Sequence, residues 1–173
     1  MEECAKFSEE VLAPINAIGD QQGAKIDNGV VTMPKEFVDA YKKFSDAGWA
    51  SISLPEEIGG GGMPITLSGG TLEILSTANL AFGLAPGLSA GAISAIHFHA
   101  NQEQKDKFLP KLVSGEWTGT MNLSEPQSGS DLGTITTKAE PQDDGTYKIT
   151  GTKVWITFGC LLYTSDAADE PMR

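Results

Sequence analysis

The polar residues best suited to bind a ligand lie in one turn, residues 124–131, which reads SEPQSGSD. The turn follows a short run, residues 117–123, in which apolar residues alternate as they do in a β-strand. A strand that leads into a turn of Gly, Ser and Pro brings backbone N–H groups and hydroxyls together. Such a group of donors suits a phosphate or the edge of a flavin ring, although an ordinary solvated loop has the same composition.

Two further strand-like runs follow, and the second carries another pair of candidate residues. Residues 134–140 and 147–157 favour β-strands, and the stretch between them predicts a hairpin connection with Gly145 at a positive φ. Because side chains alternate along a strand, Trp155 and Thr157 are expected on one face, with Val154 and Ile156 on the other. An aromatic plane beside a hydroxyl can cover a flat heteroaromatic ring and hydrogen-bond it. Taken alone, this strand more readily fits a tryptophan packed in a core.

Residues 121–133, 137–139 and 151–159 together resemble the flavin-binding signature of the acyl-CoA dehydrogenases. They read MNLSEPQSGSDLG, TKA and GTKVWITFG, in an order and spacing that extend over about forty residues. The resemblance implies an α+β fold, in which an N-terminal all-α domain (residues 1–116) precedes the first strands of an antiparallel β-domain (residues 117–159). A shift from helix-forming residues to Thr, Val, Ile and Gly near Trp117 marks the same boundary. Residues 160–173 show no family likeness and resemble a translated sequencing adapter.

The same resemblance implies that the cofactor is FAD and that six residues contact it: Leu123, Ser124, Gly129, Ser130, Trp155 and Thr157. The first two would face the flavin ring, and the next two would meet the cofactor pyrophosphate. The last two would pack against and hydrogen-bond the isoalloxazine, with Thr157 near its reactive nitrogen. Glu125 and Pro126 are expected to shape the turn.

For activity, the resemblance implies α,β-desaturation of an acyl-CoA thioester. A carboxylate base removes the α-proton while the β-hydrogen leaves as hydride to the flavin. In the family that base is a glutamate of a C-terminal helical bundle. No residue of this chain matches its place, so no catalytic residue is assigned, and the fragment as given is expected to be inactive. Two alternatives stay open: a non-catalytic flavin-binding fragment, and an acyl-CoA oxidase or flavin monooxygenase of the same fold.

Within the family, the glycine-containing segments 20–23 and 48–62 and the GEWTGTM motif at 115–121 look most like the branch with a long N-terminus. That branch includes methylmercaptopropionyl-CoA and some long-chain dehydrogenases. The implied partners are an acyl-CoA substrate and an electron-transfer flavoprotein or similar acceptor. Family members form homodimers or homotetramers.

Composition limits the other classes of function. The formal net charge is −11, from 23 acidic and 12 basic residues, which argues against a nucleic-acid partner. The sequence shows no secretory signal and no apolar run of about 18 residues that would predict a membrane span. Cys4 and Cys160 lie at opposite ends without ligand-like spacing, so neither a disulfide framework nor a metal site is expected. We therefore expect a cytoplasmic protein.

Apolar periodicity predicts five helices before the strands. The first is expected to be interrupted or to end near Pro14, and a polar connection follows over residues 19–29. The others are expected to begin at Pro34, near Thr66, after Pro86 and at Asn101.

Two remaining features could suggest ligand sites. Four consecutive glycines, residues 59–62, lack the Gly-Lys-Ser/Thr context of a phosphate loop and predict a flexible surface connection. His97 and His99 point in different directions on a helix, so a shared metal or catalytic pair is not expected.

Overall fold

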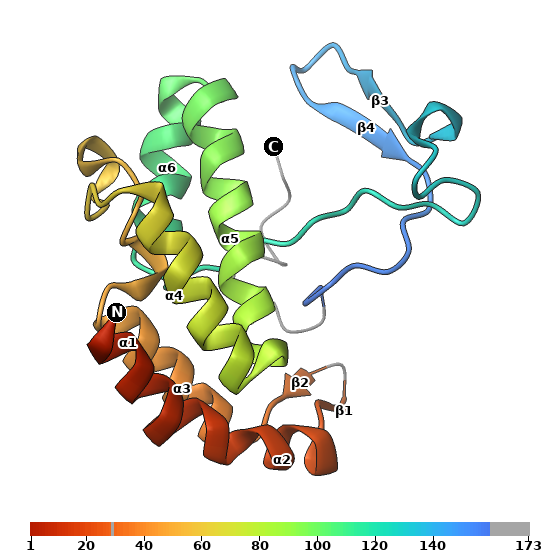
Figure 1. Ribbon diagram of the computed structural model, residues 1–173. Coiled ribbons are helices and arrows are strands. Elements are labelled where there is room, and N and C mark those ends of the chain that lie inside the picture. Colours follow the sequence, from red (N-terminus) through yellow and green to blue (C-terminus); the bar gives the residue numbers. More distant parts are fainter. Residues whose placement is uncertain (29, 160–173) are drawn as a thin grey trace.

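The computed structural model describes residues 1–28 and 30–159, which form a helical body and two short antiparallel hairpins (Figure 1). The elements in chain order are α1 (Glu2–Phe7), a π-helical turn (Ser8–Leu12), α2 (Ala13–Gln22), β1 (Lys25–Asp27), β2 (Val30–Thr32), α3 (Lys35–Asp46), α4 (Ile65–Ala78), α5 (Leu80–His99), α6 (Gln102–Val113), β3 (Lys138–Pro141) and β4 (Tyr147–Thr150). This helix-rich chain with short antiparallel strands agrees with the predicted fold class.

The longest described helix is α5, which runs along the side of the helical body that faces the β3–β4 hairpin (Figure 1). It packs against both α4 and α6, while α1 contacts α4 and α2 contacts α3. Figure 1 shows the β3–β4 hairpin set apart from the helices and joined to them by an extended segment.

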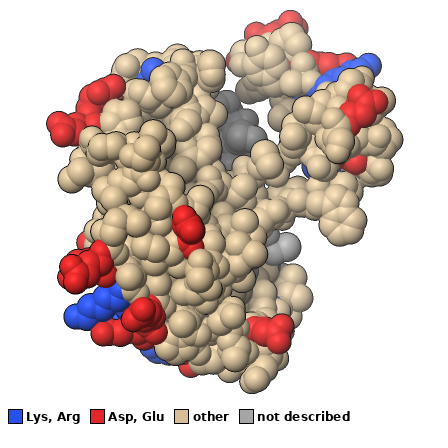
Figure 2. All heavy atoms as spheres, in the orientation of Figure 1, with Lys and Arg blue, Asp and Glu red and all other residues tan. Residues whose placement is uncertain are grey.

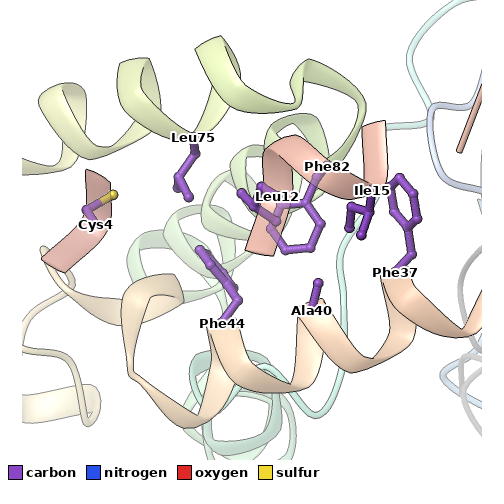
Figure 3. Packing of buried hydrophobic residues seen from close by; sticks show 8 residues of the cluster. All are labelled: Cys4, Leu12, Ile15, Phe37, Ala40, Phe44, Leu75 and Phe82. Carbon is purple, nitrogen blue, oxygen red and sulfur yellow. The ribbon is translucent and has the colours of Figure 1, made fainter. Parts of the chain in front are cut away.

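Two groups of buried side chains hold the helices together. The larger joins α1, α2, α3, α4 and α5 and consists of Cys4, Leu12, Ile15, Phe37, Ala40, Phe44, Leu75 and Phe82 (Figure 3). Within it the rings of Phe44 and Phe82 meet edge to face, with their centroids 5.6 Å apart. The smaller group joins α5 to α6 through Ile93, Leu109, Leu112 and Val113, and Trp117 packs against it. Trp117 therefore anchors the start of the extended segment to the helical body.

The predicted interruption near Pro14 is confirmed, because a π-helical turn separates α1 from α2, but the helical path does not end there. The π-helical turn directly precedes α2, and Pro14 occupies its first turn. A proline lacks an N–H and clashes with the carbonyl four residues earlier, so a wider turn ahead of it accommodates the ring. The polar connection predicted over residues 19–29 is wrong in part, because α2 extends to Gln22 and β1 pairs with β2.

The start of α5 differs from the prediction as well. The helix begins at Leu80, and Pro86 lies inside it. Asn79 caps this start, since its side-chain oxygen accepts a hydrogen bond from Phe82 N at 3.1 Å. A start after Pro86 was predicted, but an asparagine before an apolar run is the stronger start signal.

The other helices agree with their predicted starts. Pro34 precedes α3, and α4 begins at Ile65. Asn101 and Gln104 form the predicted capping box at the start of α6, each side chain bonding the backbone N–H of the other.

α5 is long and apolar enough to cross a membrane by length and composition, whereas the sequence analysis expected no such run. Glycines, serines and a proline interrupt the apolar residues of α5, so its sequence does not read as one continuous apolar run. One such helix is weak evidence for a membrane span, because a buried core helix of a globular protein meets the same criteria. Here α5 packs against α4 and α6, and 22% of its apolar window is buried.

The glycine-rich connection is bonded back onto the residues before it. Gly60, Gly61 and Gly62 donate their N–H groups to the carbonyls of Pro55, Ser51 and Leu54, at 2.9, 2.9 and 3.0 Å. These donors are therefore engaged within the connection, as expected of a structural segment and unlike a phosphate loop.

The strands are shorter than predicted. Residues 117–123 form no strand, because this segment docks on the helices: Trp117 N donates to Lys111 O at 2.9 Å, and Gly119 N donates to Ser89 Oγ at 3.0 Å. β3 begins only at Lys138, and β4 ends at Thr150. The predicted alternation of Trp155 and Thr157 on one strand face is therefore wrong, since residues 151–157 lie outside the ladder. The hairpin turn itself is confirmed, with Gly145 at φ +83°.

Candidate functional site

The polar turn is organised around the carboxylate of Glu125. Its Oε2 accepts hydrogen bonds from Thr136 N at 2.8 Å, Thr136 Oγ1 at 2.9 Å and Gln127 Nε2 at 2.6 Å. Its Oε1 accepts from Thr137 N at 3.0 Å and from Lys153 Nζ at 2.9 Å. Hydrogen bonds from Thr137 and Thr136, together with the Lys153 ammonium, hold the pKa of Glu125 far below its usual value. The carboxylate is therefore ionised throughout the neutral range.

This arrangement explains why β3 starts late. The N–H groups of Thr136 and Thr137 bond the carboxylate, and the ladder starts one residue later, at Lys138. Gly151 lies opposite this point, where an added Cβ would sit 2.1 Å from Thr137 Oγ1. A glycine is therefore required where the chain leaves β4 and passes the turn.

The two groups of predicted cofactor contacts meet beside this carboxylate. Val154 N donates to Ser124 O at 3.0 Å, and Lys153 Nζ also donates to Leu123 O at 3.0 Å. These bonds bring Leu123 and Ser124 next to the segment that leads directly into Trp155. The structure thus joins residues that lie about thirty positions apart in the sequence.

Trp155 and Thr157 extend from this junction in different surroundings. The indole of Trp155 is 87% exposed, and its backbone adopts φ +58°, a left-handed conformation that bulky residues rarely take. Thr157 lies back toward the helical body, where its carbonyl accepts a hydrogen bond from Thr120 Oγ1. An aromatic face is therefore held open to a ligand at this junction, while the next residues return to the helices.

Gly129 and Ser130 directly follow a closed turn. Glu125 and Ser128 exchange backbone hydrogen bonds of 2.7 and 3.0 Å, and Ser128 Oγ donates to Asp131 O at 2.6 Å. Both Gly129 and Ser130 are exposed, and no atom lies within 4 Å of the position of a Cβ on Gly129. The backbone here is open to close approach by an anionic group.

An apolar cavity of about 710 Å³ lies between the helices and residues 156–159. Its walls include Phe37 and Tyr41 of α3, Phe82 and Leu84 of α5, and Thr157. Burial raises the pKa of Tyr41, which donates to Gly115 O at 3.2 Å. The cavity lining contains no carboxylate among the described residues.

The space-filling view adds the distribution of charge. On the face in Figure 2, acidic side chains lie scattered over the helical body and the hairpin. His97 Nε2 lies 3.7 Å from Glu57 Oε1, and His99 is exposed. Within residues 1–28 and 30–159, no group of three or more His, Cys, Asp or Glu side chains could hold a metal ion.

Sequence reasoning missed the residues that hold the turn. Lys153, Thr136 and Thr137 were not singled out for any role, although they supply four of the five contacts to Glu125. A carboxylate in a turn of small polar residues is a weak sequence signal for such a network. Thr136, Thr137 and Lys153 lie 11 to 28 positions away from Glu125.

Comparison with known proteins identifies the family. The family model described as "Acyl-CoA dehydrogenase, N-terminal domain" matches residues 1–116. The chain belongs to the acyl-CoA dehydrogenase family. The resemblance drawn from its sequence is therefore confirmed.

Individual acyl-CoA dehydrogenases and related structures support this membership. The chain is 48% identical over 159 residues to 3-methylmercaptopropionyl-CoA dehydrogenase of Ruegeria pomeroyi, a match that covers 92% of this chain and 27% of that protein. An acyl-CoA dehydrogenase from Bacillus anthracis, solved in complex with FAD, matches with a TM-score of 0.74 at 28% identity, over 90% of this chain and 25% of the other. A chain in the electron transferring flavoprotein structure of Acidaminococcus fermentans also matches with a TM-score of 0.74, at 26% identity, over 91% of this chain and 39% of the other.

The chain thus spans about a quarter of the length of the curated acyl-CoA dehydrogenase that it matches at 48% identity. Its described residues contain the helical body, the polar turn and the two hairpins β1–β2 and β3–β4.

Proposed function

We propose that this chain is the flavin-binding N-terminal part of an FAD-dependent acyl-CoA dehydrogenase. The observation that carries the proposal is the junction at Glu125. There Leu123 and Ser124 are hydrogen-bonded to Lys153 and Val154, and the segment that continues from Val154 lines an apolar cavity at Ile156 and Thr157.

The residues present fit an FAD molecule. Open space at Gly129 admits a phosphate against the backbone, and the neighbouring Ser130 is exposed. The exposed indole of Trp155 offers a face on which a flat ring system can stack. Leu123 and Ser124 are assigned to the flavin ring and Thr157 to its reactive nitrogen, as the family signature implies.

When bound, FAD accepts the β-hydrogen of the substrate as hydride. The chain's own residues bind and orient the cofactor and shield it from water. Trp155 would stack on the flavin ring and Thr157, which lines the apolar cavity, would hydrogen-bond the ring. This cavity takes an apolar part of the acyl chain, because its walls are mainly aliphatic and aromatic.

The α-proton base lies outside the residues assigned here. Glu125 is buried and pairs with Lys153, so it is not available to abstract a proton. In this proposal, as in the sequence analysis, the base is a glutamate of the family's C-terminal bundle.

The remaining assignments extend the same proposal. The helical domain comprises residues 1–116, the flavin-binding β-domain begins at residue 117, and residues 160–173, which lie outside the described residues, form an unrelated tail. The substrate is an acyl-CoA, and the electron acceptor is an electron-transfer flavoprotein, as family membership leads us to expect. We place the enzyme in the cytoplasm as a homodimer or homotetramer.

A second candidate is a flavin-binding chain without dehydrogenase activity. Every residue of β3 and β4 is exposed, and the apolar cavity presents no carboxylate among the described residues. The lining favours a site that lacks the group that starts the reaction, and the exposed strands favour a chain that does not work alone.

FAD retention by this chain tests the flavin site that both candidates share, and acyl-CoA-dependent dye reduction by the full-length protein that contains the chain separates them. The full-length protein is loaded with FAD, freed of unbound cofactor and mixed with a series of acyl-CoA thioesters and an artificial electron acceptor. The first candidate predicts dye reduction above that of free FAD. Retained FAD without dye reduction by the full-length protein favours the second candidate, and failure of the chain to retain FAD contradicts both.

A further inference from the structure

A buried carboxylate stands out in the otherwise exposed β3–β4 region. The side chain of Glu125 is 1% exposed, whereas β3 and β4 are exposed along their full length. A buried charge is costly unless ion pairs and hydrogen bonds replace the lost water. Glu125 meets that requirement with five contacts of 2.6 to 3.0 Å.

These contacts come from three separate stretches of chain. Gln127 belongs to the polar turn, Thr136 and Thr137 precede β3, and Lys153 follows β4. One side chain therefore ties together segments that the short ladder between residues 138 and 150 does not reach.

Two of the three tied segments, the polar turn and the segment after β4, carry proposed cofactor contacts. Lys153 lies two residues before Trp155, and its ammonium also bonds the carbonyl of Leu123. Trp155 holds a left-handed backbone conformation with an exposed ring, an arrangement that persists only where the surrounding structure imposes it. The Glu125–Lys153 pair holds the backbone two residues before Trp155 and can therefore help to impose it.

We infer that Glu125, through its ion pair with Lys153 and its bonds to Thr136 and Thr137, positions the two flavin-binding segments relative to each other. Glu125 acts as a positioning residue and does not touch the cofactor. The inference rests on the proposed flavin site, and it predicts that disrupting the pair changes both the local order of the turn and the geometry of bound FAD.

The hairpin itself supplies a matched control. Glu140 and Lys148 lie directly opposite each other in the β3–β4 ladder, and both are exposed. Glu140→Gln and Lys148→Met remove the same kinds of charge as Glu125→Gln and Lys153→Met. They do so within the adjoining β3–β4 hairpin and leave the buried carboxylate unchanged. Far-UV circular dichroism checks that the helical body stays folded in every variant.

The first measurement is amide hydrogen exchange of the full chain without cofactor. Glu125→Gln and Lys153→Met should speed exchange at Thr136, Thr137 and Val154 at least tenfold, and both controls should leave it unchanged. Thr136→Val removes one hydroxyl donor but keeps both backbone donors, so it gives a smaller effect in a chain that still folds. Equal exchange in all variants would overturn the inference.

The second measurement is FAD binding, followed by calorimetry and by visible circular dichroism at saturating cofactor. Lys153→Met should weaken binding about tenfold, the change that 1.4 kcal/mol produces. It should also alter the dichroism of the bound flavin, and Lys153→Arg, which keeps the charge and the donors, should restore both. A purely structural role predicts the wild-type spectrum once FAD saturates the variant, and that result would refute positioning.

The two measurements separate the inference from the proposed function. If the wild-type chain binds no FAD, the proposed function fails, while the exchange pattern still decides whether Glu125 ties the segments together. If the wild-type chain binds FAD and Glu125→Gln binds it equally well with an unchanged spectrum, the function stands and the inference falls.

Discussion

Asn79 provides the sharpest test of how the helical body holds α5 in place. Its side chain is 1% exposed and bonds two elements at once. Its oxygen caps α5 at Phe82 N, 3.1 Å away, and its amide nitrogen donates to Leu12 O in the π-helical turn at 3.3 Å. Asn79→Ala removes both bonds.

The expected loss of stability in Asn79→Ala is the sum of the costs of the two lost hydrogen bonds. Losing the cap costs about 1 kcal/mol, and losing a buried hydrogen bond costs about 1 kcal/mol more. Asn101→Ala is the matched control. Asn101 caps α6 through Gln104 N at 2.9 Å, but it is exposed, and its side chain forms no hydrogen bond to a second element among the described residues. That control should cost about 1 kcal/mol.

Thermal unfolding followed by far-UV circular dichroism measures the difference. For a chain of this size, 1 kcal/mol lowers the Tm by about 2–4 °C. Asn79→Ala should therefore lower the Tm by about 4–8 °C, and Asn101→Ala by about half as much. Equal decreases would show that the Asn79–Leu12 bond adds nothing, which would refute the reasoning.

Three further predictions follow from single side chains. Phe44→Ala should reduce the free energy of unfolding in urea by about 3–5 kcal/mol, because Phe44 is 1% exposed. Val38→Ala, on the exposed face of α3, should change that free energy by about 0.5 kcal/mol or less. Similar costs for the two variants would contradict the assigned core. The hydrogen bonds and ammonium around Glu125 lower its pKa from an ordinary 4.5, so its stabilisation is full above that pH and is lost as the pH falls toward the folded-state pKa. The stability difference between the wild type and Glu125→Gln should accordingly narrow on acidification, and a constant difference would count against the ion pair. Burial raises the pKa of the Cys4 thiol, so in a Cys160→Ser chain it should react with a disulfide reagent at pH 8 only after unfolding, and immediate reaction would show that Cys4 is accessible.

The helical part of the fold was largely predictable because its signals are local. Asn101 and Gln104 mark the start of α6 within four residues, and apolar periodicity places α3 and α4. The differences involve proline, whose effect depends on context. Pro14 follows a π-helical turn and Pro86 lies inside α5, and neither outcome can be read from the proline itself.

The strand ends were not predictable for a different reason. Residues 134–137 and 151–157 have the composition of strands, but Thr136 and Thr137 donate their N–H groups to Glu125. A tertiary contact thus overrides a local preference, and it depends on Lys153, which lies 28 positions from Glu125.

The candidate site was predictable in part. The signature predicted which residues contact FAD, and the structure brings Ser124 next to Val154, just before Trp155. The assignment of Leu123, Ser124, Gly129, Ser130, Trp155 and Thr157 to the cofactor stays a prediction. The Glu125 network was missed because its partners come from three stretches that only the fold brings together.

Calorimetric titration of the chain with FAD, with Trp155→Ala compared against Tyr147→Ala, measures whether the junction binds a flavin. Both residues are exposed aromatics of the same region, on or just after the β3–β4 hairpin, but Trp155 alone lies at the junction beside Glu125. The account predicts saturable binding of one FAD per chain, weakened about tenfold by Trp155→Ala and unchanged by Tyr147→Ala. Absence of binding, or equal affinity in the two variants, would contradict a flavin site at residues 123–130 and 155–157.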